Sequence, residues 1–188
     1  MLWIVALSIE YPNHLQPPAK GWIFYVDQLL FTAAMLGWTA AVLGLIRLRA
    51  AGGGKLRFGL FAWALGIALL VLGNIASLTL HAFVSGSNAV YDNNPLFPLG
   101  GIISTLAALL AGIGILRARR MRGWGNWSVL AYAVYYICAL FIPLILGHEP
   151  NFVTEAGWGA AWIVVGVALT LACSPAVGVG GRKPVRPD

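Results

Sequence analysis

The sequence predicts an all-α polytopic membrane protein, a bundle of about five transmembrane helices with its amino terminus outside and its carboxyl terminus in the cytoplasm. Composition is the first observation behind this fold class, because 60% of the 188 residues are hydrophobic and only 10% are charged. Soluble domains carry about 25% charged residues, so this chain has too few charges to cover a water-exposed surface. The bilayer must therefore act as the solvent for most of the protein.

Five long apolar stretches are the second observation. A helix needs about 20 mostly apolar residues to cross the bilayer, and five segments meet this length, at residues 22–46, 58–83, 96–116, 126–147 and 156–173. The short connections between them predict antiparallel neighbours in a single bundle over residues 22–174. Residues 175–188 are rich in glycine and proline, a composition typical of a disordered tail, which we expect in the cytoplasm.

The placement of basic residues is the third observation and predicts the orientation. Clusters of arginine and lysine follow the first, third and fifth stretches, and only Lys20 falls on the other side. Short loops rich in these residues stay in the cytoplasm. Five of the six acidic residues and all three histidines fall on the opposite side, which we expect to be the outer one. Because short helices that end in arginines are common in bacterial membrane proteins, we expect the plasma membrane of a bacterium.

Residues 1–21 precede the first long stretch and form an outer segment of their own. The apolar run over residues 1–10 is too short to span the bilayer and lacks the basic start and cleavage site of a signal peptide. We expect this run to lie in the outer interface, and the tail of a truncated helix is the alternative. Pro12, Pro17 and Pro18 predict an extended segment after it.

Several classes of function find no support in the sequence. The formal charge of +6 sits in the loop clusters and leaves no soluble domain for a nucleic-acid surface, so we expect no nucleic-acid binding. The chain contains no Walker loop and no Gly-x-Ser-x-Gly, His-Glu-x-x-His or Cys-x-x-Cys motif, each of which would point to a specific chemistry. Catalytic residues and cofactors stay unknown, and whether the protein is an enzyme stays open.

The second stretch carries a polar stripe. Asn74, Ser77 and His81 follow the spacing i, i+3, i+7 and therefore share one face of a helix. With the expected orientation, Asn74 lies near mid-membrane and His81 near the outer boundary. An unpaired amide in hydrocarbon costs several kcal/mol, so this face must point into the bundle. The stripe predicts either interhelical hydrogen bonds or the wall of a polar cavity.

Three further residues are candidates for an outward-facing pocket beside this stripe. Asp27 is the one acid well inside an apolar stretch, and ionisable residues within a membrane are functional candidates, although the helix dipole also favours an acid in the first turns. Tyr136 shares a helix face with Tyr132 and Tyr135, and buried hydroxyls need partners, for which Asn74, Ser77 or Asp27 are available. Glu155 lies at the outer start of the fifth helix. The predicted ligand-binding set is Asp27, Asn74, Ser77, His81, Tyr136 and Glu155.

The same outer residues include ligand types that suit a metal. Two imidazoles and several carboxylates on one side of the membrane are appropriate for a divalent ion, and a haem bridging His81 and His148 is possible in principle. Their spacing matches no known metal motif, however, so the sequence predicts no metal site. A plain polar outer surface is the simpler interpretation.

Three functions remain open. Small residues line faces of the first and third helices, which favours close helix packing, so a non-enzymatic subunit, accessory or assembly partner ranks first, either in a homo-oligomer or with another membrane protein. The alternative is an outward-facing pocket for a lipid, small molecule, metal or haem, in a binding protein or an enzyme. A small transporter is the second alternative, because residues 44–49 resemble residues 114–119 and would close two parallel hairpins.

Overall fold

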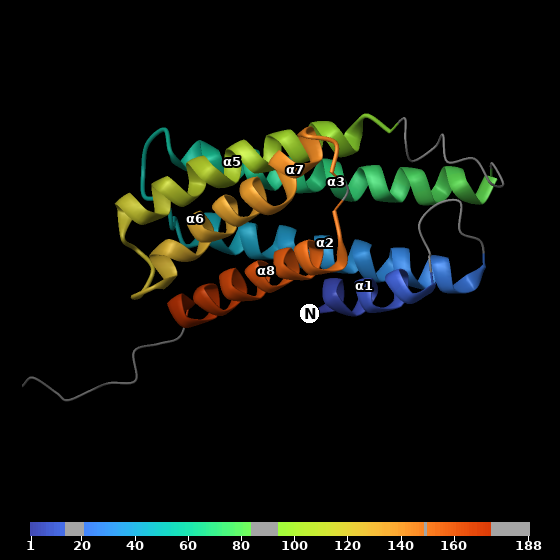
Figure 1. Ribbon diagram of the computed structural model, residues 1–188. Coiled ribbons are helices and arrows are strands. Elements are labelled where there is room, and N and C mark those ends of the chain that lie inside the picture. The colour runs from blue at the N-terminus through green and yellow to red at the C-terminus, as the bar shows by residue number, and fades with distance from the viewer. Residues whose placement is uncertain (14–20, 84–93, 149, 174–188) are drawn as a thin grey trace, which may run out of the picture.

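Figure 1 shows the computed structural model of the chain, which describes residues 1–13, 21–83, 94–148 and 150–173. These residues form helices joined by turns, and they contain no strand. Five helical segments are long and apolar enough to cross a membrane, as the sequence predicts. In chain order the helices are α1 (Leu2–Asn13), α2 (Trp22–Arg47), α3 (Arg57–Phe83), α5 (Leu96–Ala118), α6 (Gly125–Tyr136), the π-helix η1 (Ile137–Phe141), α7 (Ile142–Ile145) and α8 (Phe152–Cys173).

Four of the five long helices begin and end within a few residues of the predicted positions. The largest difference is the start of α8, which lies four residues earlier than the apolar pattern suggests. Asn151 and Thr154 explain the early start, because the Thr154 amide donates to Asn151 Oδ1 at 3.1 Å and the Asn151 amide donates to Thr154 Oγ1 at 3.0 Å. This reciprocal arrangement satisfies amides at the helix start that otherwise lack a partner.

The predicted fourth helix is not regular. α6 widens into the π-helix, in which the amide of Ile142 donates to the carbonyl of Ile137, five residues back, before α7 resumes the α-helical pattern. Pro143 accounts for the change, because it has no amide hydrogen to donate to the carbonyl of Ala139. The helix takes an extra residue into one turn, which is a recognised response to such an interruption.

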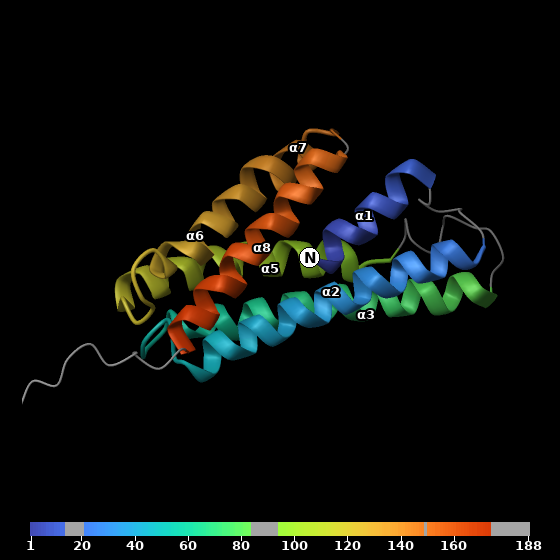
Figure 2. The same ribbon diagram turned by 90° about the horizontal axis from the view of Figure 1, so that it is seen from below.

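The long helices form a closed ring. In this ring α2 packs on α3, α3 on α5, α5 on α6, α6 on α8, and α8 again on α2. α1 packs on α2 and α8. Figure 2 shows that α6, α7 and α8 diverge from α2 and α3 toward the end of the bundle that carries α1. The ring is therefore tight at one end and opens at the other.

Glycine residues hold α3 and α5 close together. Gly59, Gly66 and Gly73 recur every seven residues and lie along one face of α3. A Cβ atom at Gly66 would lie 2.6 Å from the backbone nitrogen of Ser104, and one at Gly59 would lie 2.8 Å from that of Ala111. Only a residue without a side chain permits this backbone approach, which is how helices pack closely in an apolar medium. The sequence analysis expected small-residue packing on the first and third helices and missed this stripe on the second.

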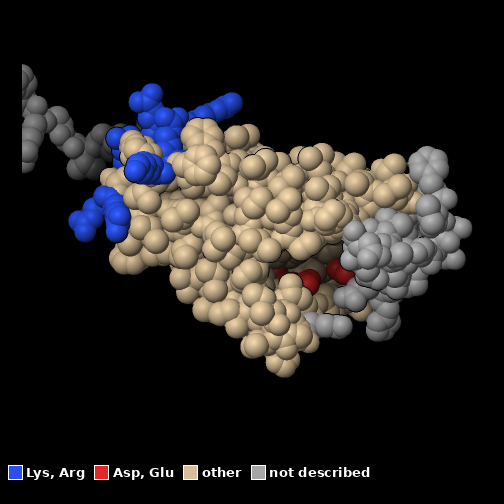
Figure 3. Space-filling model, turned by 90° about the horizontal axis from the view of Figure 1, so that it is seen from above, with Lys and Arg blue, Asp and Glu red and all other residues tan. Residues whose placement is uncertain are grey.

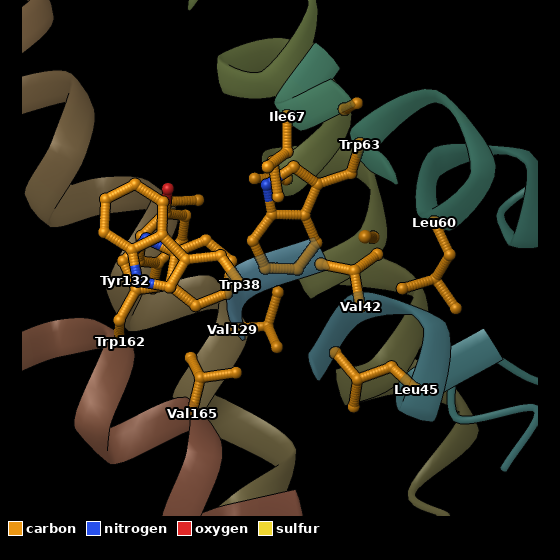
Figure 4. Packing of buried hydrophobic residues seen from close by; sticks show 14 of the residues in the cluster. Trp38, Val42, Leu45, Leu60, Trp63, Ile67, Val129, Tyr132, Trp162 and Val165 are labelled. Atoms are coloured by element: carbon orange, nitrogen blue, oxygen red, sulfur yellow. The ribbon is translucent and has the colours of Figure 1, made fainter. Parts of the chain in front are cut away.

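A cluster of large aromatic rings fills the centre of the ring (Figure 4). The indoles of Trp38 and Trp162 stack with centroids 5.1 Å apart, and those of Trp63 and Trp162 stack at 5.2 Å. Tyr132 packs on Trp162 at 4.7 Å. These four residues come from α2, α3, α6 and α8, so the aromatic cluster joins helices from every side of the ring except α5.

The two ends of the bundle differ in charge. Lysine and arginine gather at the end where α2 and α5 finish and α3 and α6 begin, coloured blue in Figure 3. We call this the basic end, and its members are Arg47, Arg49, Lys55, Arg57, Arg117, Arg119, Arg120 and Arg122. The opposite end, where α1 lies, carries the described acidic residues and is called the acidic end. This segregation is the pattern that the sequence analysis used to predict orientation.

The amino-terminal segment is a helix packed on the bundle. Trp3, Ala6 and Leu7 of α1 are buried, and the first residues lie beside Gly37 and Trp38 in the middle of α2. α1 continues through Pro12 to Asn13, so the extended conformation expected from Pro12 onward is wrong at this residue. Pro17 and Pro18 lie outside the described residues. Placement of α1 in the outer interface stays a prediction.

The glycine stripe gives a test of the α3–α5 contact. Gly66→Ala is expected to lower the free energy of unfolding by about 1–3 kcal/mol, because the new methyl group overlaps the Ser104 backbone. Gly37→Ala is the matched control, since nothing lies within 4 Å of a Cβ there, and it should be neutral or stabilise by up to ~1 kcal/mol. Thermal unfolding in detergent measures both, and equal effects would contradict the close contact.

Candidate functional site

Two adjoining cavities lie at the acidic end of the bundle. The first, called the polar cavity, has a volume of about 240 Å³, and the second, called the apolar chamber, has about 600 Å³. Both are bordered by Trp3, Met35, Phe97 and Trp158, so they share a wall and form a two-part cavity. The polar cavity is lined further by Glu10, Gln28, Phe31, Asn74 and Glu155, and the apolar chamber by Leu70, Pro98, Gly101, Ile102, Tyr136, Phe141, Leu144 and Ile145.

α1 supplies one wall of the two-part cavity and is fastened by aromatic residues. The indole of Trp3 lies 4.5 Å from the ring of Phe31 and 4.8 Å from that of Trp158. Its Nε1 donates a hydrogen bond to the backbone carbonyl of Glu155 at 3.2 Å. Tyr11 donates to the carbonyl of Pro150 at 3.4 Å. These contacts hold a short helix against α2 and α8 and so complete the site.

The described acidic residues converge on the polar cavity. Glu10 of α1 and Glu155 of α8 line it, and the negative charges of Asp27 and Glu155 both act on Glu10. Figure 3 shows acidic atoms, in red, at the bottom of a hollow away from the basic end. Three carboxylates from three helices therefore lie around one small volume.

Asp27 is the most deeply buried of these acids. Its side chain is 0% exposed, and its only hydrogen bond is to Oδ2, which accepts from Gln28 Nε2 at 3.3 Å. Oδ1 is buried without a hydrogen-bond partner in the described structure. Buried polar atoms are satisfied in the great majority of proteins, and exceptions often mark functional positions. Since Gln28 lines the polar cavity, the carboxylate of Asp27 lies directly behind its wall.

Burial and the neighbouring acids raise the pKa of Glu10. Its carboxyl lies outside the five long helices, and burial together with the charges of Asp27 and Glu155 raises its pKa from 4.5 to about 7. Burial is the larger cause, because a carboxylate loses hydration when water is excluded, and like charges nearby add to the cost. Glu10 therefore changes its charge near neutral pH.

The apolar chamber opens sideways between helices. Ile102 of α5 is 46% exposed, and Leu144 and Ile145 of α7 are 59% and 69% exposed. These side chains form the rim on the outer surface of the bundle, where they face the medium that surrounds the long helices. Gly101 forms part of the wall, and a Cβ atom there would meet only Tyr136 Oη, at 3.9 Å. The chamber thus has an apolar entrance and free space beside Gly101.

The residues of the predicted polar stripe have both roles that the sequence allows, which are hydrogen bonds between helices and the wall of a cavity. Asn74 lines the polar cavity and also joins α3 to α2, because its Nδ2 donates to Thr32 Oγ1 at 2.9 Å. Ser77 is fully buried and accepts from Asn94 Nδ2 at 2.8 Å, which ties α3 to the start of α5. The backbone of His81 belongs to α3, and its side chain lies outside the described structure.

Tyr136 and Glu155 both border cavities at the acidic end. Tyr136 lines the apolar chamber, and both residues border a third, smaller cavity of about 120 Å³. The hydroxyls of the other two tyrosines use partners that the sequence analysis did not name. Tyr135 donates to the carbonyl of Thr154 at 2.9 Å, and Tyr132 accepts from Trp158 Nε1 at 3.1 Å. Asn74, Ser77 and Asp27 are therefore not the partners of these two hydroxyls.

Several lining residues were missed from the sequence. Trp3 and Glu10 are seven residues apart. If the segment is treated as a helix, this spacing predicts that both lie on one helix face. A tryptophan near a helix end, such as Trp158, is typical of the membrane boundary, whereas its ring packs inside against Trp3 and Tyr136. Gln28 directly follows Asp27 in the sequence, and no pattern marks it as a lining residue. No local pattern marks Met35 or Phe97, which depend on how the helices diverge.

The described residues contain no group of three or more histidine, cysteine, aspartate or glutamate side chains that could hold a metal ion. His148 is exposed at the turn after α7, where its amide donates to the carbonyl of Pro143 at 2.9 Å. Haem ligation by His81 and His148 stays untested, because the side chain of His81 lies outside the described structure. The chemistry that the described site offers is therefore a set of carboxylates and amides beside a large apolar space.

Comparison with known proteins adds no further constraint: no protein-family model, no curated protein and no solved structure matches this chain.

The pKa of Glu10 predicts how stability depends on pH. Because the pKa is raised on folding, the folded state holds the proton more tightly than the unfolded state, so this contribution is fully present below about pH 4.5 and is lost as pH rises through about 7. Allowing for solvent screening, the loss is expected to be about 1–2 kcal/mol. Thermal unfolding across this range measures it.

Glu10→Gln is the control for this pH dependence, since it keeps the shape and removes the titration. The variant should unfold at a temperature that changes less between about pH 5 and about pH 8 than that of the wild type. Asp27 of α2, Glu155 of α8 and Tyr11 of α1 face Glu10 and remain in both proteins. An identical pH profile in the variant would show that Glu10 is not the responsible group.

Proposed function

We propose that the protein binds an amphiphilic molecule of the membrane, with the hydrocarbon chain in the apolar chamber and the polar head in the polar cavity. The observation that carries this proposal is that the two cavities adjoin, with Trp3, Met35, Phe97 and Trp158 in the lining of both. Ligand sites are typically concave and mostly apolar with a few polar groups at fixed positions. A lipid-like molecule has this same division between a long apolar part and a small polar part.

The lateral opening supports entry from the bilayer. Ile102, Leu144 and Ile145 at the rim are exposed apolar residues on long helices or their continuation. A hydrocarbon chain that slides between them stays in an apolar medium throughout, so it avoids the cost of crossing water. The polar head would follow the acidic end of the bundle, where water and membrane surface meet.

The other two functions have less support. Gly44 and Gly112, two of the small residues that favoured a partner protein, contact Leu169 and Leu130 of the same chain. A transporter needs a route to the opposite side, and the aromatic cluster of Trp38, Trp63, Tyr132 and Trp162 fills the bundle centre, on the basic-end side of the cavities. Binding without transport therefore fits best, and a catalytic role would need groups that the described site does not identify.

The proposed location is the plasma membrane of a bacterium, crossed five times with the acidic end outside and the basic end in the cytoplasm. The support is the segregation of lysine and arginine at one end of five helices that are long and apolar enough to span. The two-part cavity then faces the outer leaflet and the exterior.

Cysteine labelling tests this orientation. The native cysteines Cys138 and Cys173 are unpaired and exposed, so both are first replaced by alanine. An impermeant maleimide on intact cells is expected to label Asn13→Cys at the acidic end and to label Arg120→Cys at the basic end only after permeabilisation. The reverse pattern would contradict the proposed orientation and place the cavity on the cytoplasmic side.

Filling the apolar chamber tests the binding function. Gly101→Phe places a ring in the free space beside Tyr136 and is expected to reduce the lipid retained through purification by about tenfold or more, the effect of an overlap of 1–3 kcal/mol. Native mass spectrometry measures the retained molecules. Gly166→Phe in α8 is the matched control, because nothing lies within 4 Å of a Cβ at that position. Equal retention in both variants and the wild type would remove the proposal.

A further inference from the structure

The polar cavity carries negative charge that its lining does not balance. Glu10 and Glu155 border it, and Asp27 lies behind Gln28 in the same wall. Among the described residues that line the polar cavity and the apolar chamber, none is a lysine, arginine or histidine. Removing carboxylates from water is costly unless positive charge or hydrogen-bond donors accompany them. The site therefore holds an unmet demand for a positive charge.

The burial and hydrogen bonding of Asp27 are a second indication that the site requires a positive charge. Its side chain is fully buried, and one carboxylate oxygen has no hydrogen-bond partner in the described structure. The other oxygen is held by Gln28, a residue of the cavity wall. A structural acid with no ligand to serve would normally have both oxygens satisfied. Asp27 is instead linked to the polar cavity by one hydrogen bond, from the amide of Gln28 in its wall.

Aromatic side chains complete the lining. Trp3, Phe31, Phe97 and Trp158 all border the polar cavity. The face of an aromatic ring attracts a cation, most strongly where water is excluded, and such rings are the usual means of binding substituted ammonium groups. Phosphate or carboxylate head groups gain nothing from these rings and are repelled by Glu10 and Glu155.

We infer that the bound amphiphile carries a positively charged ammonium group, seated in the polar cavity between Glu10 and Glu155 against the aromatic rings. The inference rests on the binding function proposed above and specifies the chemistry of the head group. A metal cation fits less well, because the described residues contain no group of three metal-ligating side chains. An ammonium group needs only nearby negative charge and aromatic faces, which are the features present.

The ionisation of Glu10 adds a dependence on pH. Burial and the neighbouring acids raise its pKa to about 7, and a bound cation would offset both causes and favour the ionised form. Binding of a permanently charged ammonium compound should therefore strengthen as pH rises through about 7. The groups that face Glu10 are Asp27 from α2, Glu155 from α8 and Tyr11 on the same helix.

Three probes with the same dodecyl chain separate the head group from the chain. They are dodecyltrimethylammonium, dodecanol and dodecanoate, added to the full-length protein in dodecyl maltoside micelles. Tryptophan fluorescence reports binding, since Trp3 and Trp158 border both cavities. At about pH 8 the ammonium probe is expected to bind about tenfold or more tightly than dodecanol, and dodecanoate is expected to bind most weakly.

Variants of the acids test which residues are responsible. Glu10→Gln and Glu155→Gln are each expected to weaken binding of the ammonium probe by roughly three- to tenfold and to leave dodecanol binding unchanged. Arg120→Gln, a charge change at the basic end, is the control and should alter neither. If a glutamine variant does not fold, the wild type still provides a test, because only ammonium binding should strengthen between about pH 5.5 and about pH 8.5.

The outcomes distinguish this inference from the function it rests on. Equal affinities for the ammonium probe and dodecanol, or glutamine variants that weaken both probes alike, would overturn the ammonium assignment and leave chain binding intact. If no probe binds and Gly101→Phe retains as much lipid as the wild type, the binding function itself is wrong. Tight ammonium binding that depends on Glu10 and Glu155 supports both.

Discussion

The architecture depends on how closely side-chain volume lets each pair of helices approach. In an apolar medium, helices gain packing energy only by coming close. Gly59 and Gly66 of α3 bring its backbone against the backbone of α5. On the other side of the ring, Trp38 and Trp162 keep α2 and α8 apart with stacked indoles. α3 and α5 are therefore close because glycine has no side chain, and α2 and α8 are farther apart because tryptophan has the largest one. The ring cannot close evenly, and the space left at the acidic end is the two-part cavity.

Buried polar groups differ in whether they have a hydrogen-bond partner. Several buried polar side chains have partners on neighbouring helices or at their ends: Asn74 with Thr32, Ser77 with Asn94, and Tyr135 with the backbone of Thr154. These bonds fix how α3 sits against α2 and α5, and how α6 sits against α8. At the cavity the pattern changes, because Asp27 keeps an oxygen without a partner and Glu10 ionises with difficulty. Proteins commonly satisfy their structural polar groups and leave functional ones under strain. The site is distinguished by a buried carboxylate with an unpartnered oxygen, whereas the other buried atoms without partners in the described structure, Arg57 Nε and the Nε1 atoms of Trp63 and Trp162, belong to donors.

The fold was largely predictable from sequence, and the site only in part. Five apolar stretches of spanning length determine the helices, since a long apolar run has few other stable conformations in a bilayer. Asn74, Tyr136 and Glu155 were identified because polar residues in apolar helices are conspicuous, and they do border the cavities. Trp3 and Trp158 were not identified, because an aromatic residue near a helix end has the same local signature at a membrane surface as in a core. α1 was judged too short to span, which is correct, but its contacts with α2 and α8 come from packing that a local pattern does not encode. The divergence of α8 from α2, which creates the apolar chamber, is a property of the whole ring.

The π-helix at Ile137–Phe141 has a geometric consequence for the rim of the apolar chamber. Each residue of an α-helix advances the direction of its side chain by about 100°, so one additional residue in a single turn changes the rotational phase of everything that follows. Leu144 and Ile145 lie beyond this point, so the change in rotational phase determines the direction in which their side chains point and places them in the lining of the chamber. Tyr132 lies before the insertion, in the regular part of α6, where its side chain packs in the aromatic cluster. The inserted residue thus lets Tyr136 before it and Leu144 and Ile145 after it line the same chamber, although they lie on opposite sides of the interruption.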